Sequence, residues 1–193
     1  ADKATADVAE LRERKTYLHT AYSWSADGTD RFMTVYPREN LLTGTSNELK
    51  TMTVSGWGNS PVYKASRAYW AGRYYASAYV ENTTPVGIKM YISVYNNDGS
   101  FAYNAFGEII PSGQSGTTSC TFDILDGRRL ASAFVGFVSS QTESYTYKYK
   151  EMMIKCDQSA WTPSPLDDPE GAYPKFIGTY TDYVAEDSTD PTK

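Results

Sequence analysis

The feature that most constrains the fold is a two-residue alternation of side chains in the middle of the chain. Across residues 73–81 and 88–95, small or apolar side chains alternate with tyrosines and polar side chains. Successive side chains of a β-strand point to opposite faces, so each segment predicts a strand with one face in a core. The core-facing sides are Tyr74, Ala76, Ala78 and Val80 in the first segment, and Ile88, Met90, Ile92 and Val94 in the second.

Similar runs recur between clusters of Gly, Asn, Pro and Ser, about every 8–12 residues, and none of them holds a 3.6-residue apolar period. Asn97-Asp98-Gly99 is a strong hairpin signal. Further strands are expected over 101–107, 117–125, 133–139 and 145–156. This spacing predicts an all-β fold of the sandwich or jelly-roll kind.

We divide the chain into three parts. Residues 1–39 form an N-terminal linker or stem, in which 1–15 has helix-forming composition and Asp27-Gly28 marks a turn. Residues 40–165 form the β-sandwich. Residues 166–193 form a C-terminal connector, whose aromatic run and Asp/Ser/Thr cluster loosely repeat those of the N-terminal part.

The charge distribution argues against nucleic acid as a ligand. Residues 162–193 hold seven acids and two bases, and residues 1–161 hold 16 of each. Binding to phosphates needs a basic footprint, which a neutral body does not provide on balance. No apolar run approaches the roughly 18 residues of a membrane span, so we expect no membrane partner either.

The residues give little support to catalysis. His19 is the only histidine, and it lies outside the expected sandwich. A Ser-His-Asp or Cys-His arrangement within the sandwich would therefore lack its histidine. A glycosidase needs two carboxylates flanking its bond, for which Glu81 and Glu108 are the candidates. Most acids on a protein surface are simply solvated, so we expect no enzyme.

Cys120 and Cys156 are the only cysteines, and each lies in a strand-like run with apolar neighbours. Two buried separate thiols are favoured over a disulfide, because free cysteine is among the most buried residue types. Two cysteines alone do not make a structural zinc site.

The aromatic residues favour saccharide binding. Sugar rings present C–H faces that stack on aromatic rings, while amides and carboxylates bond the hydroxyl groups. Trp57, between two glycines in a predicted loop, is the best single candidate, with Asn59 and Tyr63 beside it; the alternative is a Trp that folds back over the sandwich end. If strands 73–81 and 88–95 pair, their outward tyrosines form one patch: Tyr75, Tyr79, Tyr91 and Tyr95. The alternative is that these tyrosines only stabilise the sheets.

Several segments are familiar. NLLTGTS at 40–46, YYASAYVEN at 74–82, KMYISVYN at 89–96, MMIK at 152–155 and AWTPSP at 160–165 resemble jelly-roll carbohydrate-binding modules of phage tail and baseplate proteins. HTAYSWSADGTD at 19–30, YPKFIGTYTD at 173–182 and DSTDP at 187–191 are similar to connectors in tail proteins of phages of Gram-positive bacteria.

The resemblance implies a virion component that binds host cell-wall polysaccharide without catalysis and contacts other baseplate or tail proteins. A structural spacer or docking domain is the alternative, and a cell-wall glycan hydrolase is a further one. Modules of this kind often hold a structural calcium between the first and last strands of the sandwich. Here Glu39, Asn40 and Asp157 are the candidate ligands, because carboxylate and amide oxygens suit that ion.

Overall fold

The computed structural model describes residues 15–66, 71–188, 190 and 192. Internal contacts divide the chain into two compact units, one of residues 37–173 and one of residues 1–36 with 174–193. Each unit is described by itself. The helical composition noted at residues 1–15 falls almost entirely outside the described residues.

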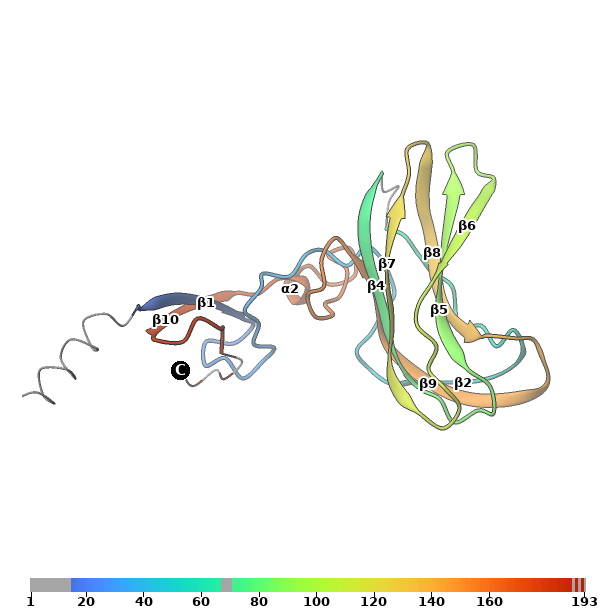
Figure 1. The fold of residues 1–193 in the computed structure, drawn as a ribbon, viewed down its shortest axis with the longest axis horizontal. Helices are drawn as coiled ribbons and strands as arrows, with labels where there is room; N and C mark the ends of the chain where they lie inside the picture. The colour runs from blue at the N-terminus through green and yellow to red at the C-terminus, as the bar shows by residue number, and fades with distance from the viewer. Residues whose placement is uncertain (1–14, 67–70, 189, 191, 193) are drawn as a thin grey trace, which may run out of the picture. The chain divides into compact units, whose positions relative to one another are not determined.

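Residues 37–173 form a sandwich of two four-stranded antiparallel sheets, which confirms the all-β jelly-roll prediction (Figure 1). In the first sheet the spatial order is β2 (Lys50–Gly56), β9 (Gln141–Lys155), β4 (Gly72–Glu81), β7 (Ser115–Ile124). In the second sheet the order is β3 (Tyr63–Lys64), β8 (Arg128–Phe137), β5 (Ile88–Asn96), β6 (Phe101–Phe106).

The core lies between the two sheets and is built from the alternating apolar residues. Ala76 and Val80 of β4 and Met90, Ile92 and Val94 of β5 are all fully buried. The opposite sides of both strands carry tyrosines and polar residues, as the two-residue period requires. The hairpin predicted at Asn97-Asp98-Gly99 joins β5 to β6, with Gly99 at a φ of 88°.

Two buried polar groups tie the ends of the sandwich together. The Asn40 amide donates to the carbonyl oxygens of Met152 and Thr162, and its oxygen accepts from the amides of Leu42 and Ile154. Lys155, at the end of β9, lies under the closing segment that follows it. The four-residue helix α2 (Pro169–Ala172) belongs to that segment. Asp168 caps α2 through a bond from the Gly171 amide.

In the other unit, β1 (Tyr17–Ser23) and β10 (Phe176–Asp182) pair antiparallel, from Tyr17 opposite Asp182 to Ser23 opposite Phe176. The N-terminal and C-terminal connectors that the sequence predicts as separate segments therefore form one two-stranded ribbon.

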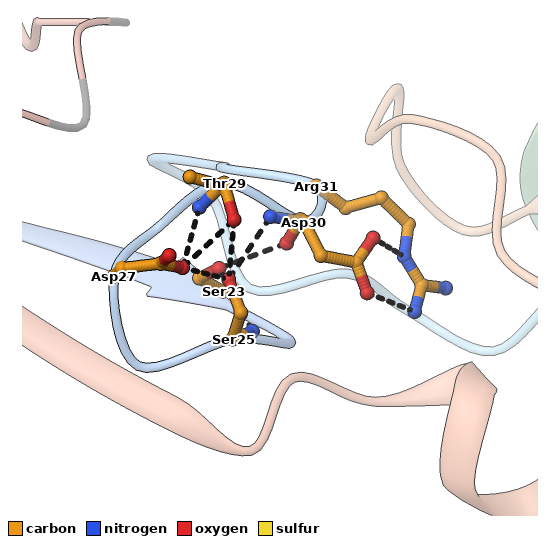
Figure 2. A network of polar contacts seen from close by, with 6 residues as sticks. All are labelled: Ser23, Ser25, Asp27, Thr29, Asp30 and Arg31. Carbon is orange, nitrogen blue, oxygen red and sulfur yellow. Dashed lines mark hydrogen bonds and ion pairs between the residues drawn. The ribbon is translucent and has the colours of Figure 1, made fainter.

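The turn predicted at Asp27-Gly28 follows β1. Figure 2 shows the Asp27 carboxylate accepting from the Ser25 and Thr29 hydroxyls at 2.6 and 2.8 Å and from the Thr29 amide at 3.1 Å. These hydrogen bonds lower the Asp27 pKa to about 2.

Both cysteines are free thiols. Cys120 on β7 is partly buried, and burial raises its pKa to about 11. Cys156 is exposed just after β9, so the expectation that both thiols are buried is wrong for this residue. The apolar run of β9 ends at Ile154 and the strand ends at Lys155, so Cys156 lies just beyond the sheet. Among the described residues, no helix has the length and apolarity to cross a membrane.

Candidate functional site

The predicted patch of four tyrosines does not form, because β4 and β5 lie in different sheets. β4 pairs with β7 and β9, whereas β5 pairs with β6 and β8. Tyr75 and Tyr79 therefore lie on the outer face of one sheet, and Tyr91 and Tyr95 on the outer face of the other. Alternation assigns a side chain to a face of its own strand, but it does not decide which strands pair.

Tyr63 is a core residue rather than a ligand contact. Its side chain is 7% exposed, and its hydroxyl lies 2.8 Å from the Tyr149 hydroxyl inside the sandwich. On β3, Tyr63 is paired with the fully buried Ala133, so both point inward. A binding role predicted for Tyr63 from its place near Trp57 is wrong for this reason.

Trp57, in contrast, projects outward from a loop whose backbone is fixed. Its side chain is 56% exposed, so it does not fold back over the sandwich end. The Trp57 carbonyl accepts from the Phe137 amide at 2.8 Å, and the next carbonyl, of Gly58, accepts from the buried Tyr147 hydroxyl at 2.7 Å. Gly58 has a φ of 61°, and a Cβ there would lie 2.2 Å from the Phe137 ring. The sequence therefore needs both flanking glycines to present this ring, since Gly56 also has a positive φ of 64°.

A shallow polar hollow of about 540 Å³ lies beside the Trp57 ring. Hydroxyl groups from the neighbouring strands β2 and β9 supply its polar atoms, and Asn59 supplies an amide. Shallow hollows with one aromatic platform and a few polar groups suit saccharides. The lining residues are Thr53, Val54, Ser55, Trp57, Gly58, Asn59 and Ser144.

Gly136 on β8 brings the Trp57 loop onto the outer face of the second sheet. Gly136 is paired with Lys89, whose side chain points outward. A Cβ at Gly136 would lie 2.6 Å from Asn59 Oδ1 and 3.6 Å from the Tyr91 ring. Asn59 and Tyr91, separated by 32 positions in the sequence, therefore both lie beside Gly136, so the hollow borders the outer face of the second sheet at this point.

Next to Asn59, three aromatic rings form a row across β6, β5 and β8. Tyr91 is stacked on Phe134 with ring centroids 4.9 Å apart, and Phe106 meets Tyr91 edge-on at 5.4 Å. The Tyr91 hydroxyl donates to the Phe137 carbonyl at 2.6 Å, which fixes the ring. Sequence reasoning missed Phe134, although the alternation of residues 128–137 indicates its outward position. Its two neighbours in the strand, Ala133 and Val135, both point into the core.

Tyr95 lies further along the same outer face, where Phe101 meets it edge-on at 5.8 Å. On the opposite face of the sandwich, Tyr75 lines a hollow of about 290 Å³ with Asp157 and Arg73. Tyr79 lies beneath the Lys150 ammonium, which is 5.5 Å from its ring centroid.

The residues suggested for calcium do not fit that ion at Asn40. The Asn40 oxygen already accepts two backbone hydrogen bonds, which occupy both of its lone pairs. One oxygen of Asp157 accepts from the amide and hydroxyl of Ser159. Glu39 is partly buried, and no group of three or more His, Cys, Asp or Glu residues within the described parts of the chain could hold a metal ion. Hydrogen bonds from Asn40 link the first and last segments where an ion was expected.

The candidate catalytic groups are engaged elsewhere or solvated. Glu81 forms an ion pair with Lys148 at 3.5 Å on the outer face of β4. Glu108 is exposed after β6. Neither lines the hollow beside Trp57. His19 lies in the β1–β10 unit, where its ring nitrogens contact Asp187 at 2.8 Å and the Val184 carbonyl at 2.9 Å.

Comparison with solved structures places this fold among known proteins. The chain is similar to a chain of the tripod (BppUct-A-L) from the baseplate of bacteriophage Tuc2009, with a TM-score of 0.56 and 24% identity over 92% of this chain and 77% of that one. At that identity the likeness establishes a shared fold. The resemblance to a phage baseplate module, first seen in the residues, is thereby confirmed at the level of the fold.

Weaker similarity extends to modules of xylan-acting proteins. The CBM22-1-GH10 modules of Clostridium thermocellum xylanase 10B match at a TM-score of 0.43 and 12% identity, over 65% of this chain and 28% of that one. The CBM22-1 xylan-binding domain from Paenibacillus barcinonensis matches at 0.37 and 12%, over 61% of this chain and all of that one. No protein-family model and no curated protein matches the chain.

Proposed function

We propose that this chain is a non-catalytic module of a phage baseplate or tail that binds a saccharide on the surface of a Gram-positive host. The observation that carries this proposal is Trp57, an exposed ring on a fixed loop beside a hydroxyl-lined hollow. A Trp that is only part of the fold would be expected to bury its large apolar face.

The loop is organised for binding before any ligand arrives. Bonds from Phe137 and Tyr147 hold the carbonyls of Trp57 and Gly58, so little backbone freedom remains to be lost. The ring itself is free to stack on a sugar, while Asn59 and the hydroxyls of Thr53 and Ser55 bond its edge. Stacking and hydrogen bonding bind a sugar without changing it, so we propose no reaction step.

The location in a virion rests on the fold shared with the Tuc2009 baseplate tripod. Other baseplate or tail proteins are then the structural partners, and host cell-wall polysaccharide is the ligand. A single shallow site binds weakly, but many copies displayed on one particle raise the overall avidity by about 10²–10⁴.

The test is labelling of a panel of Gram-positive cells by the fluorescently tagged chain, displayed as a multimer. Trp57→Ala is compared with Leu125→Ala, which changes an apolar side chain of nearly the same exposure, 55%, in the turn between β7 and β8. We expect saturable labelling that purified wall polysaccharide competes away, lost with Trp57→Ala and kept with Leu125→Ala.

Equal labelling by Trp57→Ala and the unchanged chain would show that the site lies elsewhere. Labelling of no cell in the panel would refute saccharide binding and favour the docking domain. Release of soluble sugar from the walls during the assay would refute the non-catalytic part of the proposal.

A further inference from the structure

The outer faces of the two sheets differ in charge. On the first sheet the outward side chains include both signs, with Glu81 of β4 paired to Lys148 of β9, and Asp123 of β7 beside Arg73 of β4 in register. On the second sheet the outward charged residues of the four strands are Lys64 of β3, Lys89 of β5 and Arg129 of β8. Strands β3, β5, β6 and β8 contain no Asp or Glu.

The three cations of this face have no acidic partner within the described parts of the chain. Among the described residues, none of the three forms an ion pair, whereas Lys148 and Lys150 on the other sheet each have one. The acid nearest in sequence to Arg129 is Asp126, in the turn before β8, and Asp98 and Glu108 lie in the chain before and after β6. Asp98 is engaged, since its carboxylate accepts from the Ser100 amide and hydroxyl.

Lys89 is placed directly on the aromatic row. Its ammonium lies 3.9 Å from the Phe106 ring centroid and 5.1 Å from that of Tyr91. Cation–π contacts hold the ammonium over the rings without neutralising it. A sugar that stacks on the exposed Phe106 edge of the row would therefore meet this charge at its rim.

Further along β5, the outer face of the second sheet again carries polar, aromatic and cationic side chains. The row after Tyr91 is polar, with Ser93 donating to Asn104 Oδ1 at 3.0 Å and Ser132 and Lys64 in register beyond them. Tyr95, with Arg129 opposite it, lies four residues from Tyr91, which is about 13 Å at the rise of a strand. A ligand that meets both the Tyr91 and the Tyr95 positions must therefore be a chain of several sugars rather than a single sugar.

We infer that this face, formed by Lys64, Lys89, Tyr91, Tyr95, Phe106 and Arg129, binds an anionic saccharide chain whose carboxylate or phosphodiester groups meet the three cations. The inference rests on the proposed function and specifies the class of its ligand. Charge complementarity carries it, because an anionic ligand would supply the counter-charges that the strands of this face lack, which a neutral glycan would not.

The experiment measures binding of the whole tagged chain to wall polysaccharide purified from the same cell panel. Each polysaccharide is tested untreated, after carboxyl reduction and after hydrofluoric acid cleavage of phosphodiesters. The variants are Lys89→Met, which removes the charge but keeps an apolar stem over the rings, Lys89→Arg, and Phe106→Ala. Lys150→Met is the matched control, since Lys150 also lies over a tyrosine but on the other sheet.

We expect affinity to fall as salt rises, and to fall roughly fivefold with Lys89→Met while Lys89→Arg and Lys150→Met keep it. Phe106→Ala should weaken binding at every salt concentration. Loss of binding after carboxyl reduction alone identifies a uronic acid, and loss after hydrofluoric acid alone identifies a phosphate. Salt-independent binding that survives both treatments would overturn the anionic ligand and leave the proposed function standing. Binding to no polysaccharide would overturn both.

Discussion

Lys155 provides a test of the packing that closes the sandwich. Its side chain is 0% exposed, and its ammonium lies 2.6 Å from the Ala160 carbonyl, 3.0 Å from the Thr162 hydroxyl and 3.3 Å from the Ser159 hydroxyl. Burial lowers the Lys155 pKa from 10.5 to about 8, with Asp157 opposing the shift. Burying the charged ammonium of Lys155 therefore costs folding free energy, and this cost disappears when the ammonium loses its proton.

The sign of the pH dependence follows from proton binding. Between about pH 8 and 10.5 the unfolded chain holds the Lys155 proton more tightly than the fold does, so the contribution to stability rises with pH. Each unit of difference between the Lys155 pKa in the folded and in the unfolded chain is worth about 1.4 kcal/mol, so the full gain in the free energy of unfolding is about 3 kcal/mol. About 2 kcal/mol of it is gained between pH 7 and 9.5.

The assay is urea unfolding of the unchanged chain and Lys155→Met at several pH values in this window. Burial raises the pKa of Cys120, Tyr147 and Tyr149, so these groups lose stabilisation as pH rises and mask the lysine in either chain alone. They are common to both chains and cancel in the difference.

We expect the free energy of unfolding of the unchanged chain, relative to Lys155→Met, to rise by about 2 kcal/mol from pH 7 to 9.5. A difference that stays constant across the window would show that Lys155 titrates like an exposed lysine. The closing segment would then not bury it as described.

Three further predictions concern other parts of the chain. Gly58→Ala should destabilise the sandwich by about 2–4 kcal/mol, because the added Cβ meets the Phe137 ring at a positive φ; urea unfolding measures it, and a loss below about 0.5 kcal/mol would contradict the loop geometry. Tyr63→Phe removes the bond to the Tyr149 hydroxyl and should cost about 1 kcal/mol while leaving cell labelling unchanged; reduced labelling with intact stability would return Tyr63 to the binding site. The hydrogen bond that the His19 ring donates to the Asp187 carboxylate raises the His19 pKa above its ordinary value of 6.5, and an NMR titration should show this. The stability from this contact is present at low pH and is lost as pH rises through the raised pKa; an unaltered titration in Asp187→Asn would contradict the contact.

Local patterns were sufficient to predict the class of fold and much of each strand. The two-residue period fixes which side chains of β4 and β5 face the core, since a strand allows only two faces. Asp27-Gly28 and Asn97-Asp98-Gly99 form turns because their conformations are set within a few residues. The glycines around Trp57 marked an unusual loop for the same local reason.

Pairing, in contrast, is a property of the whole chain. No period in residues 73–95 shows that β4 and β5 separate into two sheets, so the sequence alone predicts one patch of four tyrosines that the structure divides. Likewise, only the pairing of β3 with β8 turns Tyr63 into the core. In the sequence, the amide oxygen of Asn40 makes it a candidate metal ligand. Only the folded structure brings Leu42, Ile154 and Thr162 close enough to hydrogen-bond with its side chain.

Charge shows the same division most clearly. Counting residues establishes that the body of the chain is neutral, because charge adds up regardless of where it lies. The separation of Lys64, Lys89 and Arg129 onto a face without acids depends on strand order and register, which bring together residues 65 positions apart. Side-chain alternation is a local property written in each segment, whereas a binding face is assembled by long-range backbone pairing, which the packing of the whole sandwich decides.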